Sequence, residues 1–164
     1  MYNVGDKIVY PSYGAGVIEA IEEKVIHGEK HKYYAVAMPG SSVKMLLPVE
    51  RCDELCVRYV ISADDAKRVL ECFRDTPVSE DTTWNKRQRE NMVKIRSGDI
   101  FEILSVLKSL MYRDRLKGVS TSERKILSSV KQMIVSELIL SGIADRENIE
   151  NILDDIIADC IAKN

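Results

Sequence analysis

The chain has 164 residues, of which 45% are hydrophobic and 30% charged, and its formal net charge is −2. This composition is typical of a globular protein and argues against low-complexity disorder. No apolar run approaches the roughly 18 residues that a membrane span needs. The first residues lack a basic region followed by an apolar stretch, so we expect no secretory signal and a cytoplasmic protein.

The net charge gives no argument for nucleic acid, but the charges are segregated along the chain. Residues 84–96 carry five basic residues and one acid, whereas residues 145–164 carry six acids and two bases. A local basic patch can bind phosphates even in a protein that is acidic overall. The segment 84–96 is therefore the part of the chain to examine for nucleic-acid contacts.

The first 57 residues have the pattern of a small β unit. Strands are expected, in chain order, at residues 7–10, 17–26, 32–38 and 42–47. Turn chemistry is expected at Ser12, Tyr13 and Gly14–Gly16, and a hairpin turn at residues 27–30. Short strands at this spacing predict a strongly bent antiparallel sheet or a barrel.

From residue 62 to 164 the apolar residues recur at helical spacing, which predicts a bundle of about five helices. Capping residues mark where the helices begin. The expected caps are Ser62, Thr82 or Thr83, Ser120 or Thr121, and Asp145, and residues 97–99 are expected to end one helix and start the next. The expected fold class is therefore α+β, with a β domain at 1–57 and a helical domain at 62–164.

The sequence offers no convincing catalytic or metal-binding constellation. The four cysteines form no Cys-x-x-Cys pair, and we interpret them as reduced thiols, with a redox or metal role as the alternative. His27 and His31 flank the hairpin turn, where solvated histidines are expected rather than a ligand or base. Gly14–Gly16 lack the helix that follows a nucleotide-binding loop. We expect no enzyme, metal or cofactor.

The single tryptophan, Trp84, lies where a loop is expected to become a helix. Asn85, Lys86, Arg87 and Arg89 follow it, and these side chains with the helix N-terminal N–H groups can bind phosphate oxygens. A tryptophan beside arginines can stack on bases or wedge into a groove. Alternatively, Trp84 is a hydrophobic staple and the basic residues are a solvated helix face. Spacing alone leaves both interpretations open.

Two segments of the β unit form a second candidate surface. They are Lys24, Val25 and Ile26, before the hairpin turn, and Lys44, Met45 and Leu46, in the last expected strand. An exposed sheet edge can pair with a strand of a partner. The apolar run at residues 45–47 cannot all point inward, so at least one side chain is expected to face a partner or the chain's own helices.

Several segments in a fixed order resemble the CarD/CdnL family of bacterial RNA polymerase-binding regulators. They are VGDKIVYPSYGAGVIEAIEEKVIHGE and KYYAV in the β half, TTWNKRQREN in the basic segment, and SGDIFEILSVLKSLMYRD, STSERKIL and ILDDII in the helices. The resemblance covers nearly the whole chain. The β unit also resembles that of transcription-repair coupling factors, whose helicase motor this chain is too short to contain.

The resemblance implies a Tudor-like β domain that docks on the RNA polymerase β subunit, and a helical domain that contacts promoter DNA. Trp84 would be a wedge in the minor groove at the upstream edge of the transcription bubble, with Asn85, Lys86, Arg87 and Arg89 on the backbone. Residues 24–26 and 44–46 match polymerase-contacting strands. Leu46 stands where the family commonly has a basic residue, which implies a weaker or rearranged polymerase contact.

These expectations define a regulator that stabilises the open promoter complex and associates with the nucleoid through polymerase. The alternative is an adaptor that binds a protein partner through the β unit and does not bind DNA. A monomer is expected, with a domain-swapped dimer as the alternative.

Overall fold

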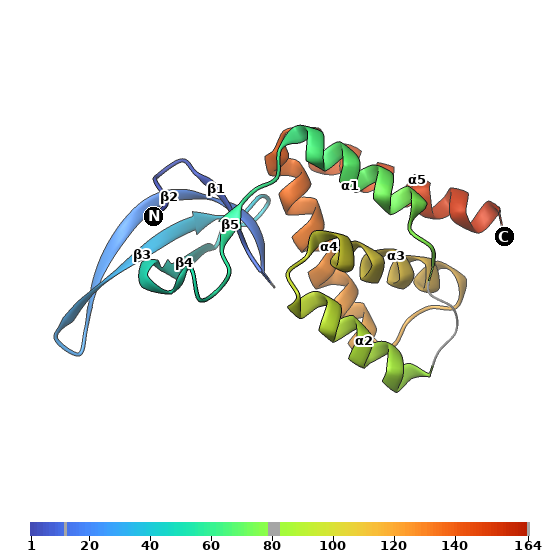
Figure 1. The fold of residues 1–164 in the computed structure, drawn as a ribbon, viewed down its shortest axis with the longest axis horizontal. Coiled ribbons are helices and arrows are strands. Elements are labelled where there is room, and N and C mark those ends of the chain that lie inside the picture. Colours follow the sequence, from blue (N-terminus) through green and yellow to red (C-terminus); the bar gives the residue numbers. More distant parts are fainter. Residues whose placement is uncertain (12, 79–82, 164) are drawn as a thin grey trace.

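The computed structural model describes residues 1–11, 13–78 and 83–163. Its fold is α+β, with a five-stranded antiparallel sheet followed by five helices (Figure 1). The strands are β1 (Lys7–Tyr10), β2 (Gly14–Ile26), β3 (Glu29–Ala37), β4 (Lys44–Pro48) and β5 (Arg58–Tyr59), and a short 3-10 helix, η1 (Val49–Arg51), follows β4.

The sheet is open rather than closed into a barrel. Its strand order is β4-β3-β2-β1-β5, and within the described residues the two outer strands, β4 and β5, are not paired with each other. The expected bent antiparallel sheet is thus confirmed, whereas a Tudor-like barrel describes it only loosely. A bulge between Ile18 and Ala20 in β2 shifts the pairing with β3 and leaves Glu19 without a partner in the register.

One face of the sheet is closed by a small apolar core that joins four strands. Ile8, Ile18, Tyr34 and Leu47 are each at most 1% exposed and pack together. Beyond this core, β2 and β3 continue as a hairpin whose residues 21–30 are all exposed, and which projects to the lower left in Figure 1. Its turn is confirmed at His27–Gly28, both with positive φ, as the right-handed twist of a hairpin favours.

Two expectations for the β half were incomplete or wrong. Gly14–Gly16 do not form a turn, because they are the first three residues of β2 and all three are buried. A Cβ at Gly16 would lie 2.5 Å from the Val36 side chain, so this glycine permits close strand packing. The sheet also extends past residue 57, since β5 pairs with β1.

The five helices are α1 (Ala63–Asp75), α2 (Trp84–Arg96), α3 (Ile100–Leu116), α4 (Thr121–Ser141) and α5 (Arg146–Ala162). Four expected capping residues, Ser62, Thr83, Ser120 and Asp145, each accept a hydrogen bond from a backbone N–H in the first turn. Asp99, where a helix was expected to start, does the same for α3. These caps confirm where the helices begin. The expected roles of Ser12 and Thr82 fall on positions outside the described residues.

Helix α4 lies between the helical core and the sheet. Its buried residues Val130, Ile134 and Leu138 pack with α1, α3 and α5, while its other side contacts β2. Figure 1 shows α4 descending next to the sheet, with the remaining helices beyond it. No helix in the described part of the chain combines the length and apolar character that crossing a membrane requires.

Candidate functional site

Trp84 is the first residue of α2 and lies at the surface. Thr83 caps this helix by accepting from the Lys86 N–H at 3.4 Å. The Trp84 side chain is 45% exposed, and its indole Nε1 donates to Ser120 Oγ at 3.4 Å. A hydrophobic staple residue precedes the cap, whereas Trp84 follows it, so the staple interpretation does not fit this position.

Ser120 brings a second helix end to Trp84. It is the N-cap of α4, where its hydroxyl accepts from the Glu123 N–H at 3.2 Å and the Glu123 carboxylate reaches back to the Ser120 N–H. The N-termini of α2 and α4 therefore meet at the indole, and each carries partial positive charge from its unpaired N–H groups. This meeting of residues 36 positions apart in the chain is the central geometric feature of the candidate site.

The structure divides the basic residues that follow Trp84 into two kinds. Asn85, Lys86 and Arg89 are exposed, and Lys86 makes a long ion pair with Glu90 at 3.9 Å. The Arg87 side chain is 16% exposed and points to Glu123, which is 3% exposed, with 3.6 Å between Nε and Oε2. Arg87 thus contributes to the packing of α2 on α4, and its phosphate role stays a prediction.

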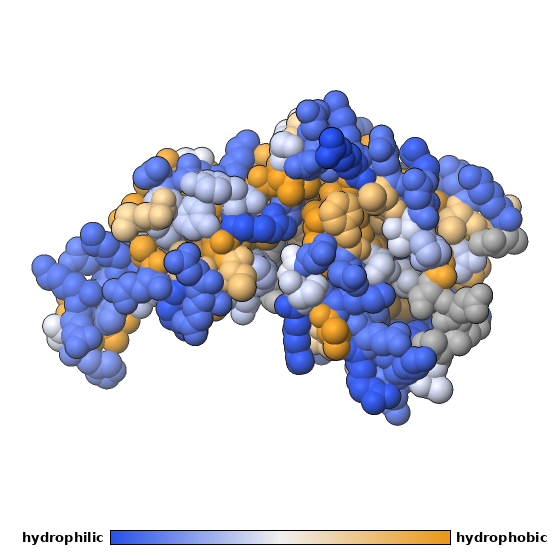
Figure 2. Space-filling model, viewed as in Figure 1, coloured by the Kyte–Doolittle hydropathy of each residue, from blue (hydrophilic) through white to orange (hydrophobic). Residues whose placement is uncertain are grey.

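Further basic residues, which sequence reasoning did not single out, lie near Ser120 in the chain. Arg113 and Arg115 are in the last turn of α3, Lys117 follows that helix, and Arg124 and Lys125 are near the start of α4. Arg124 is 57% exposed and pairs with Asp114 at 2.7 Å. Figure 2 shows hydrophilic residues gathered over α2. Their charge was visible in the sequence, whereas the contact that brings the start of α4 to Trp84 is seen only in the fold.

The second candidate surface lies on the sheet. Pairing with β3 matches Lys24 to His31 and Leu46 to Ala35, which places Lys24, Ile26, Lys44 and Leu46 on one face of the sheet. Lys24 and Leu46 are separated by about 13 Å along β3, since each residue advances a strand by about 3.3 Å. The two segments therefore share a face without touching.

The other residues of this surface differ in accessibility. Val25 is 66% exposed on the opposite face of the hairpin, and Met45 is half-buried against the core of the sheet. Leu46 is 38% exposed, which confirms that one side chain of the run at 45–47 points away from the sheet core. Lys44 pairs with Glu19 at 2.6 Å, and this carboxylate raises the Lys44 pKa. Strand β4 forms an edge of the sheet.

A cavity of about 850 Å³ opens between α2, α3 and the ends of α1 and α5. Lys108, which is 2% exposed, lines it and donates to the carbonyls of Arg74 at 2.8 Å and Thr76 at 2.6 Å. Burial lowers the Lys108 pKa. Its ammonium caps the C-terminal end of α1. No metal-binding group of three or more His, Cys, Asp or Glu residues occurs among the described positions.

Comparisons with known proteins agree with this architecture. The family profile described as "CarD-like/TRCF RID domain" matches residues 2–61, and that described as "CarD, C-terminal domain" matches residues 68–154. A protein of Bacillus subtilis strain 168, named "Putative transcription factor YdeB", is 33% identical over 148 residues, which cover 90% of this chain and 97% of that protein. The chain therefore belongs to the CarD/CdnL family of RNA polymerase-binding transcription regulators.

Proposed function

We propose that this protein stabilises the open promoter complex by holding DNA at the upstream edge of the transcription bubble while its β half is docked on the RNA polymerase β subunit. Trp84 is the wedge that fills the minor groove where the helix is opened. Asn85, Lys86 and Arg89 bind the phosphate backbone beside it. Through its docking on polymerase the protein associates with the nucleoid.

The observation that carries this proposal is the exposed indole of Trp84 at the meeting point of two helix N-termini. An aromatic side chain that is 45% exposed can enter a groove without first leaving a protein core. Helix N-termini and exposed basic side chains favour phosphate groups around it. The bond to Ser120 restricts the indole before DNA arrives, which lowers the entropy cost of inserting it.

The polymerase contact is proposed for the face that carries Lys24, Ile26, Lys44 and Leu46, together with the neighbouring Val25 and Met45. Strand β4 is an edge, so its outer N–H and C=O groups can pair with a strand of the polymerase β subunit. Leu46 is exposed on this face at a position where the family commonly has a basic residue, so it supplies no charge to the contact. Lys44, exposed on the same face, supplies the charge.

The mechanism is a shift in populations rather than a chemical step. A protein that binds the open complex more tightly than the closed one moves the equilibrium toward the open state. A difference of about 1.4 kcal/mol in binding free energy changes that equilibrium tenfold. Weak DNA affinity is sufficient, because docking on polymerase raises the effective concentration of DNA.

The test is the lifetime of open promoter complexes formed by polymerase with the wild type, with Trp84→Ala, and with Lys86→Ala/Arg89→Ala. Both variants are expected to shorten the lifetime while binding to a β-subunit fragment is unchanged. Arg68→Ala is the matched control, since Arg68 makes an exposed ion pair with Asp65 on α1, a helix outside the proposed interface.

An unchanged lifetime in both variants, with polymerase binding retained, would refute the DNA contact and favour an adaptor that binds only protein. Salt dependence gives an independent measurement. Each phosphate contact that is lost should reduce the slope of log affinity against log salt by about 0.9 for duplex DNA. The salt dependence of DNA affinity should therefore be weaker for the double variant than for the wild type. An adaptor that does not bind DNA would show no such salt dependence.

A further inference from the structure

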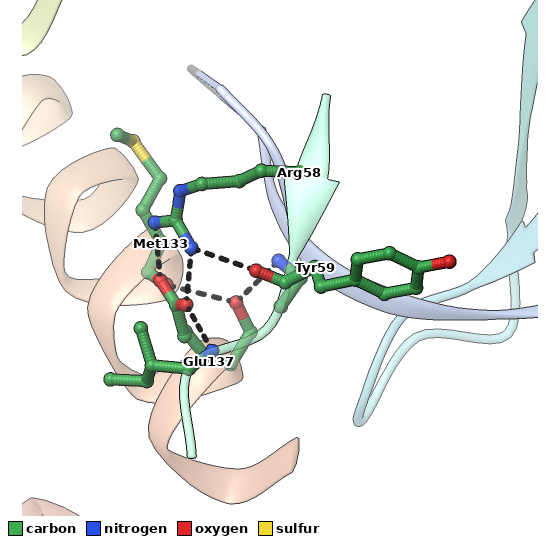
Figure 3. Close-up of polar contacts among 7 residues, drawn as sticks. Arg58, Tyr59, Met133 and Glu137 are labelled. Carbon is green, nitrogen blue, oxygen red and sulfur yellow. Dashed lines mark hydrogen bonds and ion pairs between the residues drawn. The ribbon is translucent and has the colours of Figure 1, made fainter. Parts of the chain in front are cut away.

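Helix α4 holds the sheet through a set of directed polar contacts. Arg58 in β5 donates to both carboxylate oxygens of Glu137, at 2.6 and 2.8 Å, and the Ile61 N–H donates to the same carboxylate at 3.0 Å (Figure 3). The Glu137 side chain is 3% exposed. Two N–H groups of one guanidinium fix both the distance and the plane of the pair.

A second contact lies one residue away on α4. The Ala15 N–H at the start of β2 donates to Ser136 Oγ at 2.9 Å, and that hydroxyl donates to the Met133 carbonyl at 3.1 Å. Gly14 makes this approach possible, because a Cβ there would lie 2.8 Å from Ser136 Oγ. Two adjacent residues of α4 thus hold two different strands, so rotation of the sheet about either contact is opposed by the other.

Two outer contacts extend the attachment. Lys7 Nζ donates to the Leu140 carbonyl at 3.2 Å, and Arg146 donates to the Pro39 carbonyl at 2.9 Å. Both are side chain to backbone bonds, at the end of α4 and the start of α5. The contacts between the halves therefore lie near the C-terminal part of α4, whereas Ser120 and Trp84 lie at its N-terminal end.

In this arrangement the sheet and the Trp84 indole contact opposite ends of α4. Figure 1 shows the tip of the β2–β3 hairpin and α2 both on the lower side of the molecule. A change in the angle at the sheet–α4 contact would move the indole relative to the sheet over the length of α4. That helix has 21 residues and is about 30 Å long.

We infer that Arg58, Glu137 and Ser136 are positioning residues that form a rigid joint and set where Trp84 lies relative to the polymerase-bound sheet. This inference rests on the proposed function. None of the three residues needs to touch polymerase or DNA. They act by fixing one orientation of the halves before binding, so that docking of the sheet delivers the indole to one place on the DNA.

The experiment measures orientation and function in the full chain. Spin labels on cysteines introduced at the exposed Asp53 and Asp155 report the distribution of distances between the halves, after serine replaces the accessible natural cysteines, Cys56, Cys72 and Cys160. The same variants are assayed for affinity to a β-subunit fragment and for open-complex lifetime.

Arg58→Ala is expected to broaden the distance distribution and to shorten the open-complex lifetime about fivefold, at the lower end of typical coupling between two sites. Affinity for the β-subunit fragment should change less than about twofold, within ordinary variation for a residue outside the contact. Arg58→Lys, which keeps the charge but not the two-point contact, should recover only part of both properties. Ser136→Ala removes a bond without leaving a buried charge, and provides a milder variant should Arg58→Ala fail to fold.

The control Arg68→Ala should change neither measurement. If neither Arg58→Ala nor Ser136→Ala broadens the distance distribution, the joint does not exist. The inference is also wrong if the distribution broadens but the open-complex lifetime is unchanged, while Trp84→Ala does shorten that lifetime. Normal lifetimes in both Trp84→Ala and Lys86→Ala/Arg89→Ala overturn the proposed function instead. In that case the distance distribution still decides whether the joint exists.

Discussion

Arg87 is expected to stabilise the fold, in addition to any contact that it makes with DNA. The free energy of unfolding measures this stabilisation. Arg87→Ala leaves the Glu123 carboxylate, 3% exposed, without its guanidinium partner. Removing one partner of a buried ion pair costs about 3–5 kcal/mol. Glu123 retains its contacts with the N–H and hydroxyl of Ser120, at 3.5 and 3.2 Å, so we expect a loss of about 3 kcal/mol, at the low end of that range.

Urea unfolding monitored by circular dichroism gives the free energy of unfolding, and thermal unfolding should show a midpoint about 6–12 °C lower for a chain of this size. Arg89→Ala is the matched control, because Arg89 is exposed on the same helix and its loss should cost no more than about 0.5 kcal/mol. If the two variants have equal free energies of unfolding, Arg87 does not stabilise the fold and our interpretation of its ion pair is wrong.

Three further predictions concern other parts of the fold. Burial lowers the Lys108 pKa below 10.5, so the unfolded chain binds that proton more tightly than the folded chain does. The free energy of unfolding of the wild type should therefore rise relative to that of Lys108→Met as the pH increases toward 10.5. Urea titrations in which this difference falls with increasing pH would contradict the prediction. Gly14→Ala should cost about 1–3 kcal/mol more than Gly118→Ala, since both have positive φ but only Gly14 lacks space for a Cβ; equal losses in urea unfolding would show that the contact with α4 relaxes freely. Leu46→Arg should tighten binding to the polymerase β-subunit fragment about three- to tenfold by calorimetry, and weaker binding would place Leu46 in an apolar contact.

Local signals in the sequence predicted the local structure well. Ser62 and Asp145 were identified as helix caps because a cap needs only a short polar side chain followed by helical spacing. That residues 45–47 do not all point inward followed from the two-residue period of a strand. Gly14–Gly16 were misjudged because glycine serves turns and close packing alike, and only the neighbours of each glycine in the fold, α4 at Gly14 and β3 at Gly16, decide between them.

Contacts between distant residues could not be predicted in this way. The bond between Arg58 and Glu137 joins residues 79 positions apart, and β5 is a strand of two residues whose existence depends on pairing with β1. Within the candidate site, the sequence identified Trp84 and its basic neighbours. It gave no sign that Arg87 turns inward, because its partner Glu123 lies on another helix.

Helix α2, which carries the candidate binding site, is expected to tolerate substitution at most of its positions. None of its residues, all of which the structure describes, is buried, and it attaches to the rest mainly through α3, with Ile95 against the core and Arg87 facing Glu123. Substitutions elsewhere on α2 should therefore be nearly neutral for folding. Mutation can vary the charge and shape of this helix in many combinations, so the element proposed to meet DNA is also the one most open to evolutionary tuning and to redesign.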